Sequence, residues 1–488
     1  MTNAAILIVV IPMFTAIVIT LLDLTRVRAF SGHLAIVSLG LSFGLALTLA
    51  PQVLSGQSVI YTLGSWDQII GISLLADHLS IFMVLLGNLL GFLVLIYSLA
   101  EGKYNPKFYA LLLIMMSGIS GAFLSRDIFN LFVFMEVLSI SSYILVAHYG
   151  HKGSLLAGMN YLLVSSVGLL FFLFGIGILY RYIGTLNMID MGEKIPLFYS
   201  ESPRAVILTL ALFIVGFGVK CAMVPLHTWL ADAHSIAPSP VSALLSGIVI
   251  KVGIYALFRT IQIFGLSPII GSVYTLLLYT GAVTAVFGAM MALVQSDLKR
   301  LLAYSSINQI GYILIGIGLG TEGGATGALF HTANHAVAKS CLFLCAGVVI
   351  ERTGRRKISD LGMVARQMPG VTAIFILASL SLMGIPPAGG FFSKLIIGLS
   401  SAKSGHPLIA LIVFSTSIIT GAYFLRCIGF FFRGETGHKI TEKRFSYLVY
   451  LPLVLLVSGV FIVVLSPGVG EKIMSLVSAP QEIPGFGR

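Results

Sequence analysis

Long runs of hydrophobic residues, separated by short polar joints, make up most of the chain. We count about fourteen such runs, each near the roughly 20 residues that a helix needs to cross a bilayer. Lipid offers the backbone no hydrogen-bond partners, so each run is expected to be an α-helix. The pattern therefore predicts an all-α polytopic membrane protein. The expected spans are centred near Pro12, Leu41, Leu86, Met115, Leu138, Leu170, Ile214, Ile250, Gly281, Leu314, Cys341, Leu380, Ser417 and Leu456.

Proline and glycine interrupt two of these spans, the seventh and the twelfth. In the seventh, Lys220 is followed by Pro225 and by a polar run that begins at His227. In the twelfth, the sequence GIPP at 384–387 precedes Lys394. Proline removes a backbone donor and glycine relaxes a helix, so helices 7 and 12 are expected to break near mid-membrane. Two interrupted segments in corresponding places predict a pair of inverted repeats.

The predicted repeats divide the chain into four parts. Residues 1–105 hold helices 1–3, and residues 433–488 hold helix 14 and the C-terminal tail. Between them lie two inverted five-helix repeats, helices 4–8 in residues 106–262 and helices 9–13 in residues 263–432. A binding or transport site is expected at the interface between such repeats.

Composition and charge agree with a membrane location. The chain is 57% hydrophobic and 10% charged, with a mean hydropathy of +1.02, which excludes a soluble globular protein. The net charge of +11 does not indicate nucleic acid, because the basic residues lie in separate joints and not along one surface. The first apolar run lacks a basic start and a small-residue cleavage site, so we interpret it as a retained span.

Basic residues are unevenly shared between the joints. Odd-numbered joints hold Arg26, Arg28, Lys103, Lys107, Lys152, Lys299, Arg300, Arg352, Arg355, Arg356, Lys357, Arg366, Arg433, Lys439, Lys443 and Arg444, and even-numbered joints hold only Arg126, Arg181, Lys194, Arg204, Arg259 and Lys403. Basic joints face the cytoplasm, so we expect a multi-pass protein of the cytoplasmic membrane with both termini outside.

Five charged residues fall deep inside the spans: Glu136, Lys220, Lys251, Lys339 and Lys394. A charge at the bilayer centre costs at least about 2.5–3.5 kcal/mol, so each needs a partner, water or a function. A carboxylate that approaches or leaves a buried lysine can load or discharge its proton. Lysine is a poor ligand for a metal cation, so these five residues favour proton hopping over direct sodium passage. For any single residue, a structural ion pair or a side chain reaching the interface is the alternative.

Span eleven carries His331, His335 and Lys339 at intervals of four residues, so each step rises by about 6 Å. Imidazole both accepts and donates a proton near neutral pH, which suits a relay. Two histidines in this spacing could instead bind a metal. No third ligand is apparent, so the sequence predicts no metal site; a purely structural hydrogen bond is the other alternative for His331.

Weaker polar candidates are Asp77, Asp127, His227, Asp232 and His234. Asp77 could cap its helix or pair with a lysine, and Asp127 lies at the mouth of span five. The other three follow the first break and could lead protons to the surface or satisfy freed backbone groups. The sequence shows no phosphate-cradling loop, cysteine cluster or haem motif, so it predicts no cofactor and leaves open whether the chain serves an enzyme complex.

Five segments together resemble a known family. They are DIFNLFVFME from Asp127, the stretch VKCAMVPLHTWLADAHSIAPSPVSALLSGIVIK from Val219, QSDLKRLLAYSSINQIGY from Gln295, HTANHAVAK from His331 and GIPPAGGFFSK from Gly384. They are similar to the antiporter-like subunits of respiratory complex I, membrane-bound hydrogenases and Mrp-type cation/proton antiporters. The resemblance covers about residues 70–430. It implies fourteen spans and a proton half-channel in each inverted repeat.

The resemblance also implies roles for single residues. Glu136 matches a coupling glutamate, Lys220 its partner on helix 7, Lys251 a connecting residue on helix 8, His335 and Lys339 a relay on helix 11, and Lys394 a terminal lysine on helix 12. The short C-terminus and the lysine at position 394 make the chain most similar to the D-type Mrp subunit or its hydrogenase counterpart. The implied partners are other integral membrane subunits, with protons and in some members Na⁺ as transported ions. A self-sufficient antiporter and a purely structural membrane subunit are the alternatives.

Overall fold

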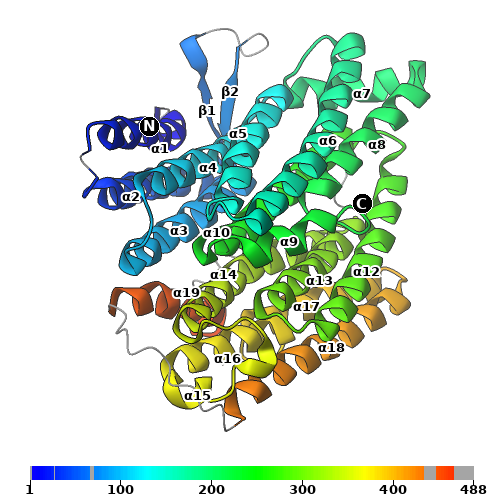
Figure 1. Ribbon diagram of the computed structural model, residues 1–488. Helices are drawn as coiled ribbons and strands as arrows, with labels where there is room; N and C mark the ends of the chain where they lie inside the picture. Colours follow the sequence, from blue (N-terminus) through cyan, green and yellow to red (C-terminus); the bar gives the residue numbers. More distant parts are fainter. Residues whose placement is uncertain (1–2, 27, 66–70, 434–446, 466–488) are drawn as a thin grey trace.

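The computed structural model describes residues 3–26, 28–65, 71–433 and 447–465. Twelve helices in this part of the chain are long and apolar enough to cross a membrane, and Pro369–Met383 and Tyr447–Phe461 are shorter apolar helices. Each of the fourteen predicted centres lies inside one of these helices. The all-α membrane architecture is therefore confirmed (Figure 1). The predicted basic residues Lys439, Lys443 and Arg444 and the C-terminal tail lie outside the described residues.

The elements follow one another as α1 (Asn3–Leu24), α2 (Ser31–Leu54), β1 (Val59–Thr62), η1 (Leu63–Ser65), β2 (Ser73–Ala76), α3 (His78–Glu101), α4 (Pro106–Leu124), α5 (Ile128–Val146), α6 (Lys152–Ile183), α7 (Met188–Glu201), α8 (Pro203–Lys220), α9 (Thr228–Ile236), α10 (Ser239–Leu244), η2 (Leu245–Val249), α11 (Ile250–Phe264), α12 (Ile270–Val294), α13 (Leu298–Gly318), α14 (Glu322–Thr353), η3 (Ile358–Asp360), α15 (Val364–Gln367), α16 (Pro369–Met383), α17 (Gly389–Lys403), α18 (Pro407–Phe432) and α19 (Tyr447–Leu465). The segment η2 is a π-helix that joins α10 and α11 into one span, Ser239–Phe264.

Both predicted helix breaks are present. Helix α8 ends at Lys220 and α9 begins at Thr228, while α16 ends at Met383 and α17 begins at Gly389. The two lysines lie on opposite sides of their breaks, because Lys220 is the last residue of α8 whereas Lys394 is in the second turn of α17. These positions agree with the order in the sequence, in which Lys220 precedes Pro225 and Lys394 follows GIPP at 384–387.

Asp127 and Asp297 occupy matching positions before α5 and α13. Each carboxylate caps its helix by accepting a hydrogen bond from the backbone N–H three residues later. The donors are Asn130 N, at 2.7 Å, and Arg300 N, at 2.9 Å. Each residue also forms an isolated antiparallel bridge with the joint that follows the next long helix, at Asn187 and Lys357 respectively. The same local structure is thus built twice along the chain.

These two starts lie toward opposite ends of α3. Ser125, just before α5, is bridged to Leu74, which precedes α3. At the other end, Lys103, which follows α3, forms an ion pair with Glu351 of α14, and the joint after α14 is bridged to Asp297, just before α13. Helix α3 has 24 residues and is about 36 Å long, so the starts of α5 and α13 are on opposite sides of the molecule.

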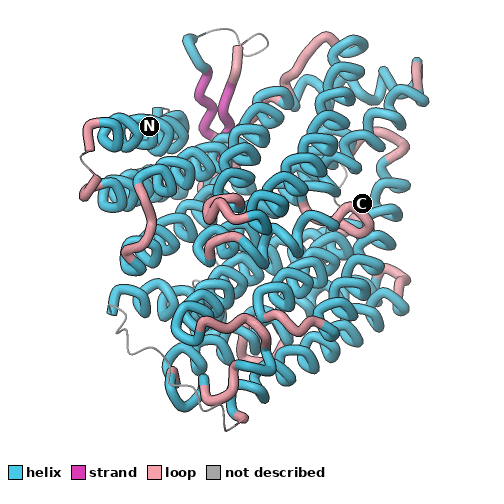
Figure 2. The backbone as a smooth tube through the Cα atoms, in the orientation of Figure 1, coloured by secondary structure: helices cyan, strands magenta, loops and turns pink. Residues whose placement is uncertain are grey.

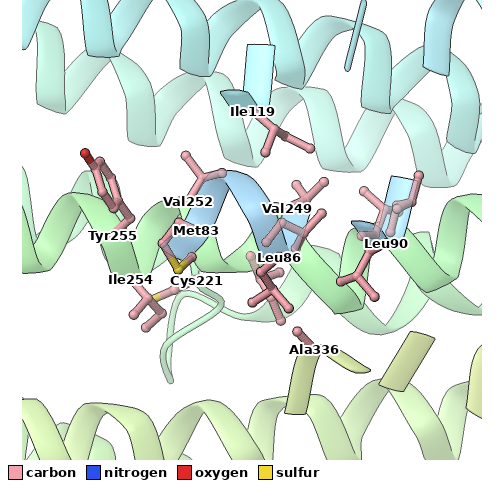
Figure 3. Packing of buried hydrophobic residues seen from close by; sticks show 14 of the residues in the cluster. Met83, Leu86, Leu90, Ile119, Cys221, Val249, Val252, Ile254, Tyr255 and Ala336 are labelled. Carbon is pink, nitrogen blue, oxygen red and sulfur yellow. The ribbon is translucent and has the colours of Figure 1, made fainter. Parts of the chain in front are cut away.

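The centre of the molecule is formed by spans that other helices surround. The most hydrophobic stretches of Ser239–Phe264 and of α13 are wholly buried, whereas α6 and α18 bury only 39% of theirs. Figure 3 shows Met83, Leu86 and Leu90 of α3 among Val249 and other side chains of this central span. Charged residues on the central helices are therefore shielded from lipid by the chain itself.

The elements outside the spans were not predicted; besides η1, η3 and α15, they are of two kinds. One is the antiparallel pair β1–β2, which Figure 2 shows at one end of the helical bundle. The other is α7, which buries Met191 and Ile195 while Leu197 is exposed. Its apolar residues recur at intervals of three and four, so an amphipathic helix could have been found between spans six and seven.

Candidate functional site: a buried row of lysines and histidines

The buried row consists of Lys220, Lys251, Lys339, His335, His331 and Lys394. Lys220 lies at one end of it, at the break between α8 and α9. Its side chain is buried, and its ammonium donates hydrogen bonds to Ser139 of α5 and, at 3.0 Å, to Ser165 of α6. The nitrogen also lies 5.9 Å from the centre of the Tyr161 ring. Within the described part of the chain, neutral hydroxyls and an aromatic face hold this lysine, and its contacts include no ion pair.

Glu136 lies one turn before Ser139 on α5 and is half-buried. Val133 and Ile140, which share its face of the helix, are 38% and 54% exposed. Glu136 therefore lies on a face of α5 that the chain leaves partly uncovered. The charges of Glu136 and Lys220 act on each other, but the structure does not bring them together as an ion pair.

Lys251 and Lys339 form the middle of the row and are both fully buried. Lys251 donates to the backbone carbonyl of Ser246 in η2, and the Ser246 hydroxyl is 2.8 Å from the Ser306 hydroxyl of α13. Ser306 donates to the Leu302 carbonyl at 3.0 Å, and Lys339 donates to the same oxygen at 2.7 Å. Hydrogen-bonding groups thus connect α11 to α14 through α13. π-Helical segments are frequent at functional sites, and η2 lies at this junction.

The two histidines continue the row along α14. The rings of His331 and His335 are nearly parallel, with centres 6.2 Å apart, and both side chains are fully buried. Nδ1 of His331 is 2.8 Å from the Ser393 hydroxyl of α17. Neither ring nitrogen of His335 has a hydrogen-bond partner among the described residues. His335 is therefore not explained by a structural hydrogen bond, whereas His331 has one.

Lys394 lies at the other end of the row, next to Ser393. Its ammonium donates to the Leu382 carbonyl at 2.5 Å and to the Ser417 hydroxyl at 3.0 Å, and lies 4.6 Å from the centre of the Tyr312 ring. Two oxygen acceptors and one tyrosine ring therefore surround Lys394, as they do Lys220. The two ends of the row have the same chemistry.

Asp77 has a different role from a proton carrier. It caps α3, and its two oxygens accept hydrogen bonds from Arg259 at 2.7 and 2.8 Å. Burial alone would raise the pKa of Asp77, but the Arg259 guanidinium holds it below its ordinary value. The sequence placed Arg259 in a joint; this was wrong, because Arg259 lies inside α11 and is only 6% exposed. The partner of Asp77 is thus an arginine and not a lysine.

The remaining candidates lie apart from the row. Burial raises the pKa of Asp127, whose carboxylate caps α5. Asp232 forms an ion pair of 2.8 Å with Arg300, with both side chains about 40% exposed. The His227 ring packs against Phe287 at 4.7 Å. These contacts assign Asp127 and Asp232 local structural partners.

Sequence reasoning gave too little weight to two residues beside the row. His234 is fully buried, and within the described residues neither ring nitrogen has a hydrogen-bond partner. The charges of Lys299, Lys339 and Lys251 all act on it. Lys299, which the sequence placed in a joint, is buried in α13 and donates to the Ala237 carbonyl at 2.5 Å. Both residues lie near the edge of a span in the sequence, and the sequence alone does not show that such a polar side chain is buried.

A family model described as "NADH:quinone oxidoreductase/Mrp antiporter, TM" matches residues 125–420. The chain belongs to this family. All five segments that carried the resemblance lie within the match of this NADH:quinone oxidoreductase/Mrp antiporter family. The chain is 36% identical to the N subunit of the NADH-quinone oxidoreductase of Desulforudis audaxviator, over 87% of this chain and 85% of that protein.

A second relative and a solved structure are also similar over most of the chain. The chain is 33% identical to the D subunit of the Na⁺/H⁺ antiporter of Alkalihalophilus pseudofirmus, over 85% of this chain and 84% of that protein. A chain in the structure of the membrane-bound sulfane sulfur reductase, an archaeal respiratory membrane complex, superposes with a TM-score of 0.91 at 29% identity, over 98% of this chain and 97% of that one. The similarity therefore extends over the full set of helices.

Proposed function

We propose that this chain is a proton-translocating subunit of a multisubunit membrane complex. The observation that carries the proposal is the row from Lys220 through Lys251, Lys339 and His335 to Lys394, all of whose side chains are buried. Lysine donates a proton as an ammonium and accepts one as a neutral amine, and imidazole and hydroxyl groups do both, whereas a metal cation would be repelled by charged lysines. Keeping so many ionisable groups in the membrane is costly, and function is the default explanation.

Transfer along the row follows from its contacts. At each end, a lysine is held by neutral acceptors, so its charge is sensitive to any carboxylate that approaches. In the middle, the hydrogen-bonded hydroxyls of Ser246 and Ser306 lie between Lys251 and Lys339 and can carry a proton part of the way from one lysine to the other. The row thus has a lysine whose charge can change at each end and hydrogen-bonded hydroxyls in the middle.

Two inverted repeats, residues 106–262 and 263–432, would each supply one half of the row. The matched starts of α5 and α13 on opposite sides of the molecule support this division. Lys251 and Lys339 then belong to different repeats, so the junction between them is the repeat interface. This is where the site of an inverted-repeat transporter is expected.

Glu136 is the group best placed to couple the row to a neighbouring subunit. It is half-buried on the partly uncovered face of α5, and Ser139, one turn away, holds Lys220. A cation of a partner that approached Glu136 would draw the carboxylate away from Lys220, and the weaker attraction would release the lysine's proton. Both relatives are named as one lettered subunit among others, which supports membership of a larger assembly. We further propose a cytoplasmic-membrane location with both termini outside.

The test uses the complete complex in proteoliposomes with a pH-sensitive dye inside. Lys394→Met should abolish proton flux without changing assembly, because it removes the proton-carrying group at one end of the row. Lys403→Met is the matched control, since Lys403 is exposed on the same helix, and it should retain flux. Normal flux with Lys394→Met would overturn the proposal. Adding Na⁺ to vesicles that hold this chain alone tests the self-sufficient antiporter: without partners, we expect no exchange.

A further inference from the structure

Three charged side chains form a cluster at the end of α3 that is remote from Asp77. Lys103, which follows α3, is 3.1 Å from Glu101 Oε1 and 2.5 Å from Glu351 Oε2 on α14. The Glu101 side chain has no exposed surface, while Lys103 and Glu351 are 36% and 29% exposed. The cluster therefore connects the surface of the molecule to a buried carboxylate.

One ammonium between two carboxylates leaves one negative charge over. Burial alone would lower the pKa of Lys103, but Glu101 and Glu351 raise it, so Lys103 stays charged at neutral pH. Within the described residues, Oε2 of Glu101 and the hydroxyl of Tyr104 are buried, and the phenols of Tyr97 and Tyr104 lie near the Glu101 carboxylate. A proton bound to the carboxylates neutralises the remaining charge and gives the buried oxygen a hydrogen to donate.

The surroundings of Glu101 hold few competing charges. The groups around it are Tyr97, Lys103, Tyr104, Tyr109, Tyr149, Glu351 and Lys299. His148 packs against Tyr104 with ring centres 5.9 Å apart, and burial lowers the pKa of this histidine. Burial raises the pKa of Tyr104 and of Tyr149, so these phenols are neutral at physiological pH. The carboxylates of Glu101 and Glu351 are consequently the proton-accepting groups of the cluster.

A polar seam leads from the cluster toward the row. Tyr97 lies one turn inside Glu101 on α3, and its buried hydroxyl donates to the Leu344 carbonyl of α14 at 3.2 Å. One turn deeper on α14 lies Ser340, the neighbour of Lys339. The seam between α3 and α14 thus places a hydroxyl and a carbonyl between the carboxylate pair and the middle of the row.

We propose that Glu101, Lys103 and Glu351 form a proton-collecting site that supplies the buried row along the α3–α14 seam. A proton from water forms an O–H bond with a carboxylate, moves to Glu101, and leaves it inward as the carboxylate is regenerated. Tyr97 is the first inward group: its oxygen takes the proton from Glu101 while its own hydroxyl proton passes to a water molecule in the seam, so that the phenol is unchanged after the transfer. The cluster belongs to odd-numbered joints, so this uptake is from the predicted cytoplasmic side. The inference rests on the proposed function of the row.

The experiment measures initial proton flux of the complete complex in proteoliposomes between pH 5.5 and 8.5. Glu101→Gln should lower flux by about tenfold or more near neutral pH, as expected for removal of a proton-transferring group, and should flatten the dependence on pH. Glu101→Asp should restore both, because it retains the carboxylate. Tyr97→Phe, which keeps the ring and removes the hydroxyl, should also lower flux. Asp360→Asn, a change at a half-buried position in the joint that follows α14, is the control.

The outcomes separate the inference from the function on which it rests. If Lys394→Met abolishes flux but Glu101→Gln and Tyr97→Phe keep the rate and pH profile of the unchanged complex, the collecting site is refuted and the row stands. A uniform loss of flux in Glu101→Gln with an unaltered pH profile, not restored by Glu101→Asp, also refutes it and assigns Glu101 a structural role. If Lys394→Met has no effect, the proposed function itself fails.

Discussion

The buried ion pair between Asp77 and Arg259 makes a quantitative prediction about stability. Asp77→Asn removes the charge while keeping a side chain that caps α3 nearly as well. Arg259, whose side chain is 7% exposed, would keep its neutral partners Tyr255 and Gln262 but lose its counter-charge. Breaking a buried pair on one side costs about 3–5 kcal/mol, and the 24% exposure of Asp77 places the expected cost near 3 kcal/mol.

The expected change in melting temperature follows from the size of the chain. At about 2.1 cal/mol/K per residue, the unfolding entropy of 488 residues is about 1 kcal/mol/K, so Tm should fall by roughly 3 °C. Thermal unfolding in detergent, followed by the fluorescence of a thiol-reactive dye that labels the buried cysteines, measures this shift. Glu193→Gln is the matched control, because Glu193 lines the same cavity of about 490 Å³ and forms no ion pair with another described residue.

The pH dependence provides a second check. The pKa of Asp77 is lower in the folded protein than its ordinary value, so the pair's contribution is complete above that ordinary value. It is lost only as the pH falls through the lowered pKa. The difference in Tm between Asp77→Asn and the unchanged protein should therefore be the same at pH 5.5 and pH 8. Three results would refute the reasoning: no difference in Tm between Asp77→Asn and the unchanged protein, an equal fall in Tm in Glu193→Gln, or a difference that disappears at pH 5.5.

Three further substitutions test other parts of the structure. Ser306→Ala removes the hydroxyl contact between α13 and η2. One net hydrogen bond is worth about 0.5–1.5 kcal/mol, so proton flux in proteoliposomes should fall by roughly 2- to 12-fold. Unchanged flux would exclude this contact from the proton path. Gly390→Ala would place a Cβ 1.9 Å from a backbone oxygen of α16, so the yield of folded protein should collapse, whereas Gly421→Ala meets open space and should express normally. The Asp232–Arg300 pair is exposed, so Asp232→Asn should change Tm by less than the equivalent of about 1 kcal/mol, and a larger fall would show an additional role.

Most of the architecture could be predicted because lipid leaves the backbone few choices. Length and hydropathy located every span in the described residues, and proline with glycine located both breaks. The charged row was visible because a lysine inside an apolar run is rare. The β1–β2 pair was missed because it lies in a joint, where hydropathy carries no signal.

Contacts between helices could not be predicted in the same way. Hydropathy does not show which faces meet, so Arg259 and Lys299 were assigned to joints although the structure buries both. The expected pairing of Glu136 with Lys220 depended on the rotation of α5, and Ser139 occupies the position facing the lysine instead. The Ser246–Ser306 contact likewise joins residues from separate spans that no local pattern connects.

Lys339 offers the most direct test of a continuous proton path, because it lies in the middle of the row and contacts α13 from α14. Proton flux should be measured in proteoliposomes holding the complete complex with Lys339→Met, which keeps the length of the side chain and removes its charge. Lys357→Met, at an exposed position beyond the same helix, serves as the control. We predict normal assembly and loss of flux for Lys339→Met, with flux retained for Lys357→Met. Full flux in an assembled Lys339→Met complex would contradict a proton path through the buried row.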